Sequence, residues 1–378
     1  MKIALVISSL EVGGAESQLC QIAKQLKNDG HEMEVWLLRK RGDFLASVEG
    51  VGIPVLNLGK RSRIDVLRPS INLIRYTKAF SPDAIFCILP SACLHALAAK
   101  FAYPKAVFCW RIVATKSTLP NYGRWAGLGY ELQRLLAGLC DHYISNSRAG
   151  ALSAVGDGFN REKMHVLQNG VDTNFFKPDP ELGKAWLSQI GLDPHRPVIG
   201  IVGRLDLAKD HETFFKALTC LEAQMPGVAQ YVILGRGSGV HADLVKSRIE
   251  AFHRQGIAIR HIEHESDMSR VYNALTIFTM TSVSEGLPNA LLEALACGTY
   301  CVVTDVGDCA EVMASDGVVA NIKDSGVISI AWRARLLSGE YESAKQVRRV
   351  QKRYGLQAMV RSLADILAQK EPSRAFLL

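Results

Sequence analysis

The chain has 378 residues, of which 48% are hydrophobic and 21% charged, and its net charge is +7. This length predicts two domains, and the composition excludes a disordered chain. No apolar run approaches the roughly 20 residues that span a bilayer, and the apolar first ten residues lack the features of a signal peptide. The nine scattered cysteines form no C-x-x-C pair, which argues against a disulfide framework or a zinc site and favours the cytoplasm.

The first half of the chain alternates predicted strands and predicted helices. Residues 2–9 form an apolar run typical of a buried parallel strand. Gly13 and Gly14 follow it, and an apolar stripe with helical spacing, which includes Leu19 and Leu26, comes next. Further strands are predicted at residues 31–38, 84–89, 106–112, 142–145 and 164–168. This alternation predicts a parallel sheet with helices on both faces.

The second half repeats the plan after a segment rich in Pro, Asp and Gly, residues 172–197, where the domains are expected to join. Its strands are predicted at residues 198–202, 231–234, 258–262, 277–280 and 299–304. We therefore predict an α/β protein with two Rossmann-like, doubly wound domains, residues 1–180 and 181–354. Residues 355–378 are expected to form a C-terminal helix and tail that packs back on the N-terminal domain.

The most informative pattern follows the strand at residues 277–280. Gly286 permits a tight turn, and Pro288 suits the first turn of a helix. The amides around Pro288 would then point out of a helix N-terminus, which is a ready anion site. Glu293 lies about one turn beyond and is placed to accept hydrogen bonds from ribose hydroxyls, whereas Glu285 would face whatever lies beyond the phosphates. Taken singly, Glu293 is more readily interpreted as a solvated helix carboxylate and Glu285 as a turn residue, and the whole segment is what favours a functional role.

Two glycine turns with nearby polar residues form the second pattern. A predicted strand ends at Gly203, and Arg204 and Lys209 follow before the next helix. Two cations at a helix start suit a diphosphate and the negative charge that grows on it as the bond breaks; ordinary loop cations are the alternative. Gly13 and Gly14 let the backbone approach a ligand, but they lack the G-x-G-x-x-G fingerprint, and a structural turn is the alternative.

Together these segments resemble the retaining glycosyltransferases of family 4, also called glycosyl transferases group 1. The resemblance rests on the E-x7-E spacing of Glu285 and Glu293, on the G-R-L-x-x-x-K run at residues 203–209, and on Asp305-Val306-Gly307. It implies the GT-B fold, in which two Rossmann-like domains face each other across a cleft that binds the nucleotide sugar.

The resemblance also implies roles for individual residues. In the family, the glutamate that matches Glu285 contacts the donor sugar, and the one that matches Glu293 holds the ribose. Arg204 and Lys209 match the cations that grip the diphosphate, so the expected catalytic residues are Glu285, Arg204 and Lys209. The other expected substrate-binding residues belong to the first glycine loop and to the start of the helix after Glu285: Gly13, Gly14, Gly286, Leu287, Pro288 and Asn289.

Some residues depart from the family pattern. Arg111 stands roughly where many members carry a histidine at the end of an N-domain strand. An arginine cannot act as a base, but it could bind a phosphate or an anionic acceptor, so we include Arg111 among the substrate-binding residues. Asp210 stands where the family often has a glycine, which is a minor departure. His95 is expected to be a satisfied or surface histidine.

These inferences predict an enzyme that moves a sugar, with retention, from a nucleotide-diphosphate sugar to a glycan or lipid-linked glycan in surface polysaccharide or lipopolysaccharide biosynthesis. In the family the leaving diphosphate can assist the incoming hydroxyl, and no metal or other cofactor is expected. Two alternatives stay open: a nucleotide-sugar epimerase, for which no acid–base residues are identified, and a non-catalytic subunit that binds a nucleotide sugar.

Basic residues gather in the first half of the chain: Arg39, Lys40, Arg41, Lys60, Arg61, Arg63 and Arg68. A solvated surface is one interpretation, and contact with anionic lipid head groups is the other. Nucleic acid is not expected, because aromatic residues do not interleave with these charges. The second interpretation predicts a cytoplasmic protein that is peripheral on the inner face of the cell membrane.

Overall fold

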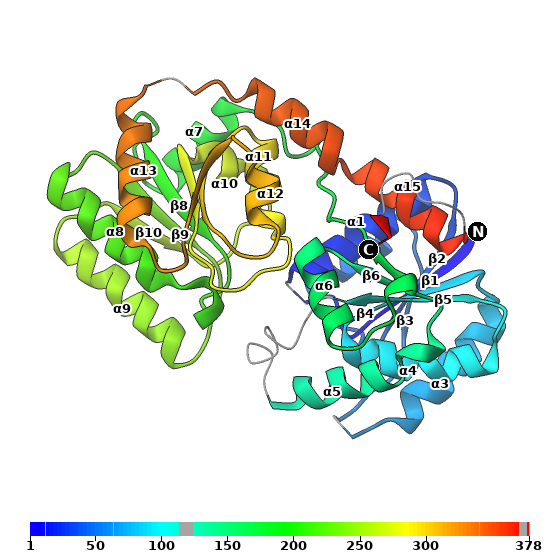
Figure 1. Cartoon of the computed structure of the whole chain (residues 1–378). Coiled ribbons are helices and arrows are strands. Elements are labelled where there is room, and N and C mark those ends of the chain that lie inside the picture. Colours follow the sequence, from blue (N-terminus) through cyan, green and yellow to red (C-terminus); the bar gives the residue numbers. More distant parts are fainter. Residues whose placement is uncertain (12, 63, 113–123, 340, 370–375, 378) are drawn as a thin grey trace. The chain divides into compact units, whose positions relative to one another are not determined.

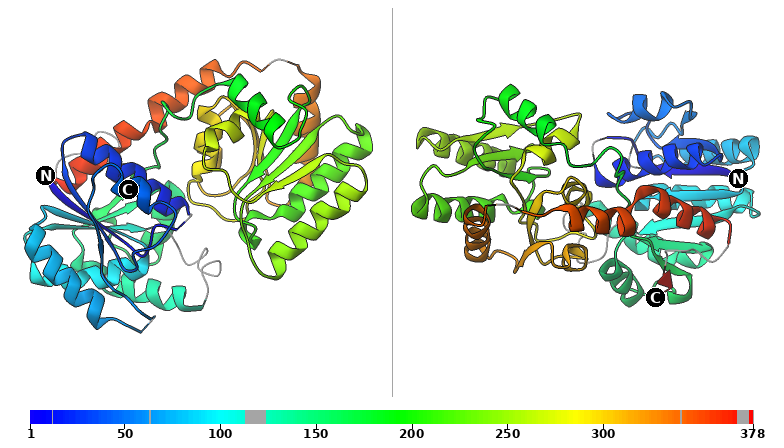
Figure 2. Two further views of the ribbon diagram at one scale, coloured as in Figure 1. Left: turned by 180° about the vertical axis from the view of Figure 1, so that it is seen from behind. Right: turned by 90° about the horizontal axis from the view of Figure 1, so that it is seen from above.

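The computed structural model describes residues 1–11, 13–62, 64–112, 124–339, 341–369 and 376–377. The chain forms two compact units (Figures 1 and 2), one of Met1–Gly170 with Leu356–Leu378 and one of Val171–Gly355. The chain thus enters the second unit before the expected boundary at residues 180/181. The reason is that Val171 and Phe176 already pack in the hydrophobic core of the second unit.

The first unit is built on a sheet that has eight strands among the described residues, in the order β14-β7-β6-β5-β4-β1-β2-β3. These strands are β1 (Lys2–Ile7), β2 (Glu32–Leu37), β3 (Val55–Asn57), β4 (Ala84–Ile88), β5 (Val107–Ile112), β6 (His142–Ser145), β7 (Met164–Val166) and β14 (Phe376–Leu377). Only β14 is antiparallel to its neighbour among these described strands. Along β1, Ile3 and Leu5 pack on one face and Ala4 and Val6 on the other, so both faces are buried.

Helices cover both faces of this sheet. One face carries α1 (Gly14–Asn28), α2 (Leu45–Glu49) and α15 (Leu356–Leu367). The other carries α3 (Leu67–Phe80), α4 (Pro90–Ala102), α5 (Arg124–Leu135) and α6 (Arg148–Gly156). The C-terminal helix α15 packs beside α1 (Figure 1) and buries Leu363 and Ile366 in the core of the first unit.

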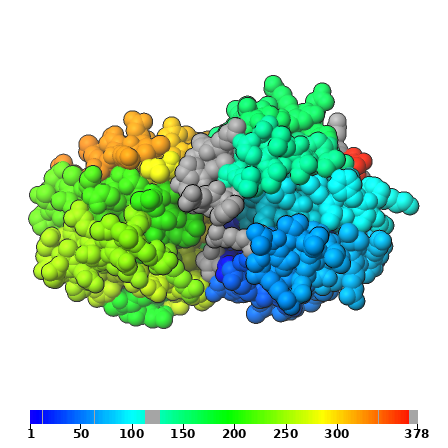
Figure 3. All heavy atoms as spheres, turned by 90° about the horizontal axis from the view of Figure 1, so that it is seen from below, coloured from blue at the N-terminus to red at the C-terminus, as the bar shows by residue number. Residues whose placement is uncertain are grey.

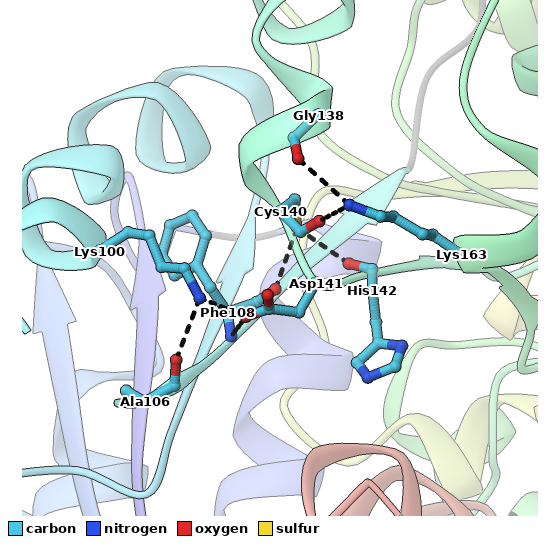
Figure 4. A network of polar contacts seen from close by, with 8 residues as sticks. All are labelled: Lys100, Ala106, Phe108, Gly138, Cys140, Asp141, His142 and Lys163. Carbon is cyan, nitrogen blue, oxygen red and sulfur yellow. Dashed lines mark hydrogen bonds and ion pairs between the residues drawn. The ribbon is translucent and has the colours of Figure 1, made fainter. Parts of the chain in front are cut away.

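A polar network fixes the start of β6 against β5 (Figure 4). The Asp141 carboxylate accepts a hydrogen bond from the Phe108 amide (2.8 Å) and forms an ion pair with Lys100 on α4 (2.6 Å). Lys163 donates to the carbonyl oxygen of Cys140 (2.8 Å). These contacts connect one helix to the central strands, so Asp141 has a structural role.

The second unit is built on a six-stranded sheet in the order β10-β9-β8-β11-β12-β13, as far as the described residues show. Its strands are β8 (Val198–Val202), β9 (Gln230–Leu234), β10 (Ile259–Ile262), β11 (Ile277–Met280), β12 (Tyr300–Thr304) and β13 (Gly317–Ala320), and they all pair in parallel. One face carries α7 (Pro180–Gln189), α10 (Met268–Ala274), α11 (Asn289–Ala296), α12 (Cys309–Met313) and α14 (Ala344–Tyr354). The other carries α8 (His211–Gln224), α9 (Val240–Arg254) and α13 (Ser325–Leu337).

Both sheets reverse their strand order beside their first strand. The chain moves from β1 to β2 and β3 on one side and then to β4 on the other, and it does the same around β8, with β11 on the far side. The carboxyl ends of such strand pairs are where open α/β sheets bind ligands. The predicted α/β fold with two doubly wound sheets is confirmed. Within the described ranges, no helix combines the length and hydropathy that crossing a bilayer requires.

Candidate functional site

The loops after β8 and β11 are bonded to each other at the carboxyl ends of these neighbouring strands. The amide of Val283 donates to the carbonyl oxygen of Ala208 (2.8 Å), and the Thr281 hydroxyl donates to that of Lys209 (2.8 Å). Thr281 is fully buried, so the bond to Lys209 is shielded from water. The backbone of Lys209 is therefore fixed beside the segment that carries Glu285.

Lys209 and Glu285 form an ion pair at this place. The Lys209 Nζ lies 2.5 Å from Glu285 Oε1, and both side chains are mostly buried, at 18% and 17% exposed. The Ser282 hydroxyl donates to the same carboxylate oxygen (2.9 Å). The structure thus brings together two of the expected catalytic residues through a charge-assisted hydrogen bond, which is stronger than a neutral one.

Arg204 extends from the same loop into solvent. Its side chain is 64% exposed, and its Nη2 lies 3.0 Å from Asp206 Oδ2. An exposed ion pair of this kind contributes little to stability, so the guanidinium can exchange Asp206 for another anion at small cost. Asp210 has a left-handed backbone (φ 46°) and caps α8 by accepting from the Thr213 amide. A left-handed backbone suits the glycine that is common there, and an aspartate tolerates it because its short side chain bonds locally.

Glycines let the backbones of neighbouring loops touch. A Cβ on Gly235, whose φ is +152°, would lie 1.9 Å from the carbonyl oxygen of Gly203. A Cβ on Gly203 would in turn lie 2.9 Å from the Cε of Lys209. The amide of Leu205 donates to the carbonyl oxygen of Arg236 (2.9 Å). The loop after β9 therefore supports the loop that carries Arg204 and Lys209.

The segment that leads to α11 is held from the other side by the loop after β12. The Asp308 amide donates to the Gly286 carbonyl oxygen (3.0 Å). A Cβ on Gly307, which has a left-handed φ of +57°, would lie 2.2 Å from that same oxygen. The helix begins at Asn289, so Pro288 is its N-cap and lies just before the first turn in which it was expected. The side chain of Leu287 packs in the hydrophobic core.

Glu293 lies on α11, partly buried. The Tyr272 hydroxyl donates to its Oε2 (2.7 Å). Burial raises the pKa of the Glu293 carboxyl to about 7, and the hydrogen bond from Tyr272 offsets this only in part. The carboxyl therefore titrates near neutral pH, and Tyr272, which is itself fully buried, fixes its orientation.

The remaining expected site residues belong to the first unit. Gly13 is the N-cap of α1, and a Cβ there would lie 2.2 Å from Glu16 Oε2, so the Glu16 side chain occupies the space beside Gly13. Gly14 is the first residue of α1. Arg111 is only 4% exposed, and its Nη2 donates to Asn169 Oδ1 (2.5 Å). Burial lowers the pKa of the Arg111 guanidinium to about 10. A substrate-binding role for Gly13, Gly14 and Arg111 stays a prediction.

The basic residues of the first half fall into different environments. Lys40 pairs with Glu49 (2.7 Å), and Arg41 pairs with Glu11 (3.3 Å). Arg61 and Arg68 are exposed. Arg39 and Lys60 are partly buried, and Arg63 lies outside the described residues. His95 is buried at 6% exposure and contacts Lys60, so the expectation of a satisfied or surface histidine holds only in part.

Sequence reasoning missed the residues that orient the site. Tyr272 binds Glu293 from 21 positions away, and Asp206 pairs with Arg204 in a loop without a diagnostic pattern. The contact of Tyr272 with Glu293 becomes evident only once the strands are ordered, whereas Asp206 lies two residues from Arg204 on the same loop. Among the described residues, no group of three or more His, Cys, Asp or Glu is arranged to hold a metal ion.

Comparison with known proteins follows the division into two units. The profile described as Glycosyltransferase Family 4 matches residues 12–175, and the profile described as Glycosyl transferases group 1 matches residues 196–335. The chain is 24% identical to EpsF of Bacillus subtilis over 339 residues, which cover 87% of this chain and 85% of that relative.

A second relative is the lipopolysaccharide core biosynthesis mannosyltransferase LpsB of Rhizobium meliloti, with 26% identity over 53% of this chain and 59% of that relative. The solved structure of HepE from Anabaena in complex with UDP-glucose has a TM-score of 0.83 at 20% identity and covers 98% of this chain and 100% of that one. The chain has the GT-B fold and belongs to family 4 of the glycosyltransferases, the glycosyl transferases group 1, so it is a glycosyltransferase.

Proposed function

We propose that this glycosyltransferase takes its sugar from a nucleoside-diphosphate sugar held at the carboxyl ends of β8 and β11 and transfers it with retention. The ion pair of Lys209 and Glu285, with Arg204 on the same loop, carries the proposal. Two cations near a helix N-terminus are suited to a diphosphate. The complex of HepE with UDP-glucose supports a sugar nucleotide of this type as the donor.

The cations act on the bond that breaks. As the bond between the anomeric carbon and the diphosphate oxygen opens, negative charge grows on the diphosphate, and Lys209 and Arg204 stabilise it. Arg204 exchanges Asp206 for the diphosphate, and Lys209 shares its ammonium between the diphosphate and Glu285. The acceptor hydroxyl attacks the same face of the sugar, and its proton passes to the leaving diphosphate. The protein then needs no base of its own and acts by positioning and by charge.

The two glutamates bind different parts of the donor. Glu285 accepts hydrogen bonds from hydroxyls of the transferred sugar, which lies beyond the phosphates. Glu293, in its ionised form, accepts from the ribose hydroxyls, while Tyr272 holds its second oxygen in place. Because a carboxylate accepts but a carboxylic acid also donates, the protonation state of Glu293 governs how well it binds a diol.

The acceptor is proposed to be a glycan or a lipid-linked glycan of a surface polysaccharide, which the name of LpsB supports. The surface around the start of α3 supports a membrane-bound acceptor. This surface is part of the blue segment in Figure 3. Ile64, Leu67 and Ile71 are 90%, 78% and 62% exposed there, close in sequence to the exposed Arg61 and Arg68. Exposed apolar side chains among cations suit an anionic bilayer surface.

The membrane proposal is tested by sedimentation with phosphatidylglycerol vesicles at low salt. Wild type should co-sediment, Leu67→Asp should not, and Val240→Asp, which changes an equally exposed apolar residue on α9, should bind as wild type does. A wild-type protein that ignores the vesicles overturns peripheral binding at the inner face of the membrane.

Thermal shift against a panel of nucleotides and nucleotide sugars tests the donor proposal. One nucleotide sugar should raise the melting temperature of wild type but not of Arg204→Ala, since binding to the folded state alone stabilises it. No shift with any nucleotide sugar at millimolar concentration would overturn the proposal. With the donor known, the anomeric configuration of the product, read by NMR, tests retention.

A further inference from the structure

Lys60 and Arg39 are two cations of the first unit that lie close together, since the Lys60 amide donates to the carbonyl oxygen of Leu38 (2.8 Å). Both are partly buried, and among the described residues neither forms an ion pair with a carboxylate. Arg39 is near enough to Lys60 to lower the pKa of the Lys60 ammonium, although burial is the larger cause, and Asp65 opposes the shift only weakly. Two like charges that share a partly buried place repel each other. An anion that joins them would relieve this repulsion.

The closest neighbours of Lys60 lie on the first two turns of α4. Its Nζ is 2.6 Å from His95 Nε2 and 3.5 Å from the Ser91 hydroxyl. His95 is only 6% exposed, and its other ring nitrogen has no hydrogen-bond partner among the described residues. The helix begins at Pro90, and in the described part of the chain no side chain caps it. Its N-terminus adds a partial positive charge to that of Lys60, so a third positive group converges on the same place.

Arg39, Lys60 and Ser91 lie at a place in the fold that is typical of ligand sites. Arg39 follows β2, Lys60 follows β3, and Ser91 follows β4. These strands surround β1, and β1 and β4 mark the point where the strand order of the first unit reverses. Ligands of open α/β sheets bind outside the carboxyl ends of the strands at this point.

We propose that Lys60, Arg39 and the first turn of α4 bind a phosphate group carried by the acceptor of the transfer. That this phosphate belongs to the acceptor of the transfer rests on the proposed function, whereas the phosphate site itself does not. A phosphate monoester has a charge between −1 and −2 at neutral pH, which matches two cations and a helix N-terminus. A neutral glycan would leave all three positive groups uncompensated, so these residues select an acidic acceptor and position it.

Calorimetric titration with glucose 6-phosphate and with glucose tests the site. Titrations use the Arg204→Ala chain, so that the cation proposed for the donor diphosphate does not contribute. Glucose 6-phosphate should bind at least about tenfold more tightly than glucose. Adding Lys60→Gln or Arg39→Gln should weaken it by about tenfold, and Lys60→Arg should restore it to within about threefold. Lys40→Gln is the matched control, because it removes an equal charge that is already paired with Glu49.

Two outcomes overturn the site. If the chain binds glucose 6-phosphate equally well with and without Lys60→Gln and Arg39→Gln, these two residues do not bind the phosphate. A loss of binding to phosphatidylglycerol vesicles in Lys60→Gln, with unchanged affinity for glucose 6-phosphate, assigns the cations to a lipid surface instead. If glucose 6-phosphate binds as expected while no nucleotide sugar shifts the melting temperature of wild type, the donor proposal fails and the phosphate site stands.

Discussion

The ionisation of the Glu293 carboxyl near neutral pH is predicted to affect the stability of the folded chain. Burial raises its pKa from 4.5 to about 7. Between these two pKa values the folded chain holds a proton that the unfolded chain has lost. The free energy of unfolding therefore falls by about 3 kcal/mol as pH rises from about 4.5 to about 7, and it is level at higher pH. Denaturant unfolding of wild type and Glu293→Gln across this range measures the difference. Parallel pH profiles would show that the pKa is not raised.

Glu285 should affect turnover rather than donor affinity. Glu285→Gln keeps the shape of the side chain but removes the charge beside Lys209, so we expect kcat to fall by about 10²- to 10³-fold. The Kd of the donor should change by less than about threefold, because the phosphates are held by other groups. Steady-state kinetics and titration separate the two effects. Glu212→Gln, which breaks an exposed ion pair with Arg248, is the control. A weakened Kd with unchanged kcat would reverse the assignment.

The sequence indicated which candidate residues lie near one another better than it indicated their environments. The spacing of Glu285 and Glu293 and the turn before Arg204 depend on local chain geometry, which the sequence records. Exposure and pairing depend on neighbours that are distant in the chain. The burial of Arg111 against Asn169 and the contact of His95 with Lys60 arise from strand order, and no local pattern shows them.

At the scale of elements, Gly235 in the loop after β9 is a structural requirement of the proposed donor site. Gly235→Ala would drive a Cβ into the carbonyl group of Gly203 and should cost about 1–3 kcal/mol of stability and weaken donor binding. Gly239→Ala is the control, because that residue has a left-handed φ of +83° but nothing within 4 Å of the added Cβ. Chemical denaturation and donor titration measure both effects. Equal costs in the two variants would show that contact with Gly203 does not matter.

Most strands were predicted, and those that were missed are short strands at the edges of the sheets. Residues 142–145, 198–202 and 277–280 coincide with β6, β8 and β11. Strands β8 and β11 are mostly apolar because both faces of their sheet are buried. The short β3 and β13 were missed. Each lies at an edge of its sheet, and an edge strand needs less apolar surface to be stable.

At the scale of the whole molecule, the chain passes between the two units at Gly170 and again at Gly355. Helix α15 therefore stabilises the first unit although it follows the second in sequence. Leu363 is fully buried in that core, and Leu363→Ala should cost about 2–5 kcal/mol. Hydrogen exchange should show faster opening of Met1–Gly170, with donor affinity within about twofold of wild type because the donor residues belong to the second unit. Faster exchange confined to Val171–Gly355 would contradict this.

The central claim is that the second unit grips the diphosphate of the donor through Arg204 and Lys209 and its ribose through Glu293. Calorimetric titration of the matching nucleoside diphosphate into the full chain tests it most directly. We expect Arg204→Ala and Glu293→Gln each to weaken binding by at least about tenfold, a loss of about 1.4 kcal/mol or more. Arg248→Ala, on the exposed side of α9, should bind as wild type does. Equal affinity in all four proteins would contradict the account.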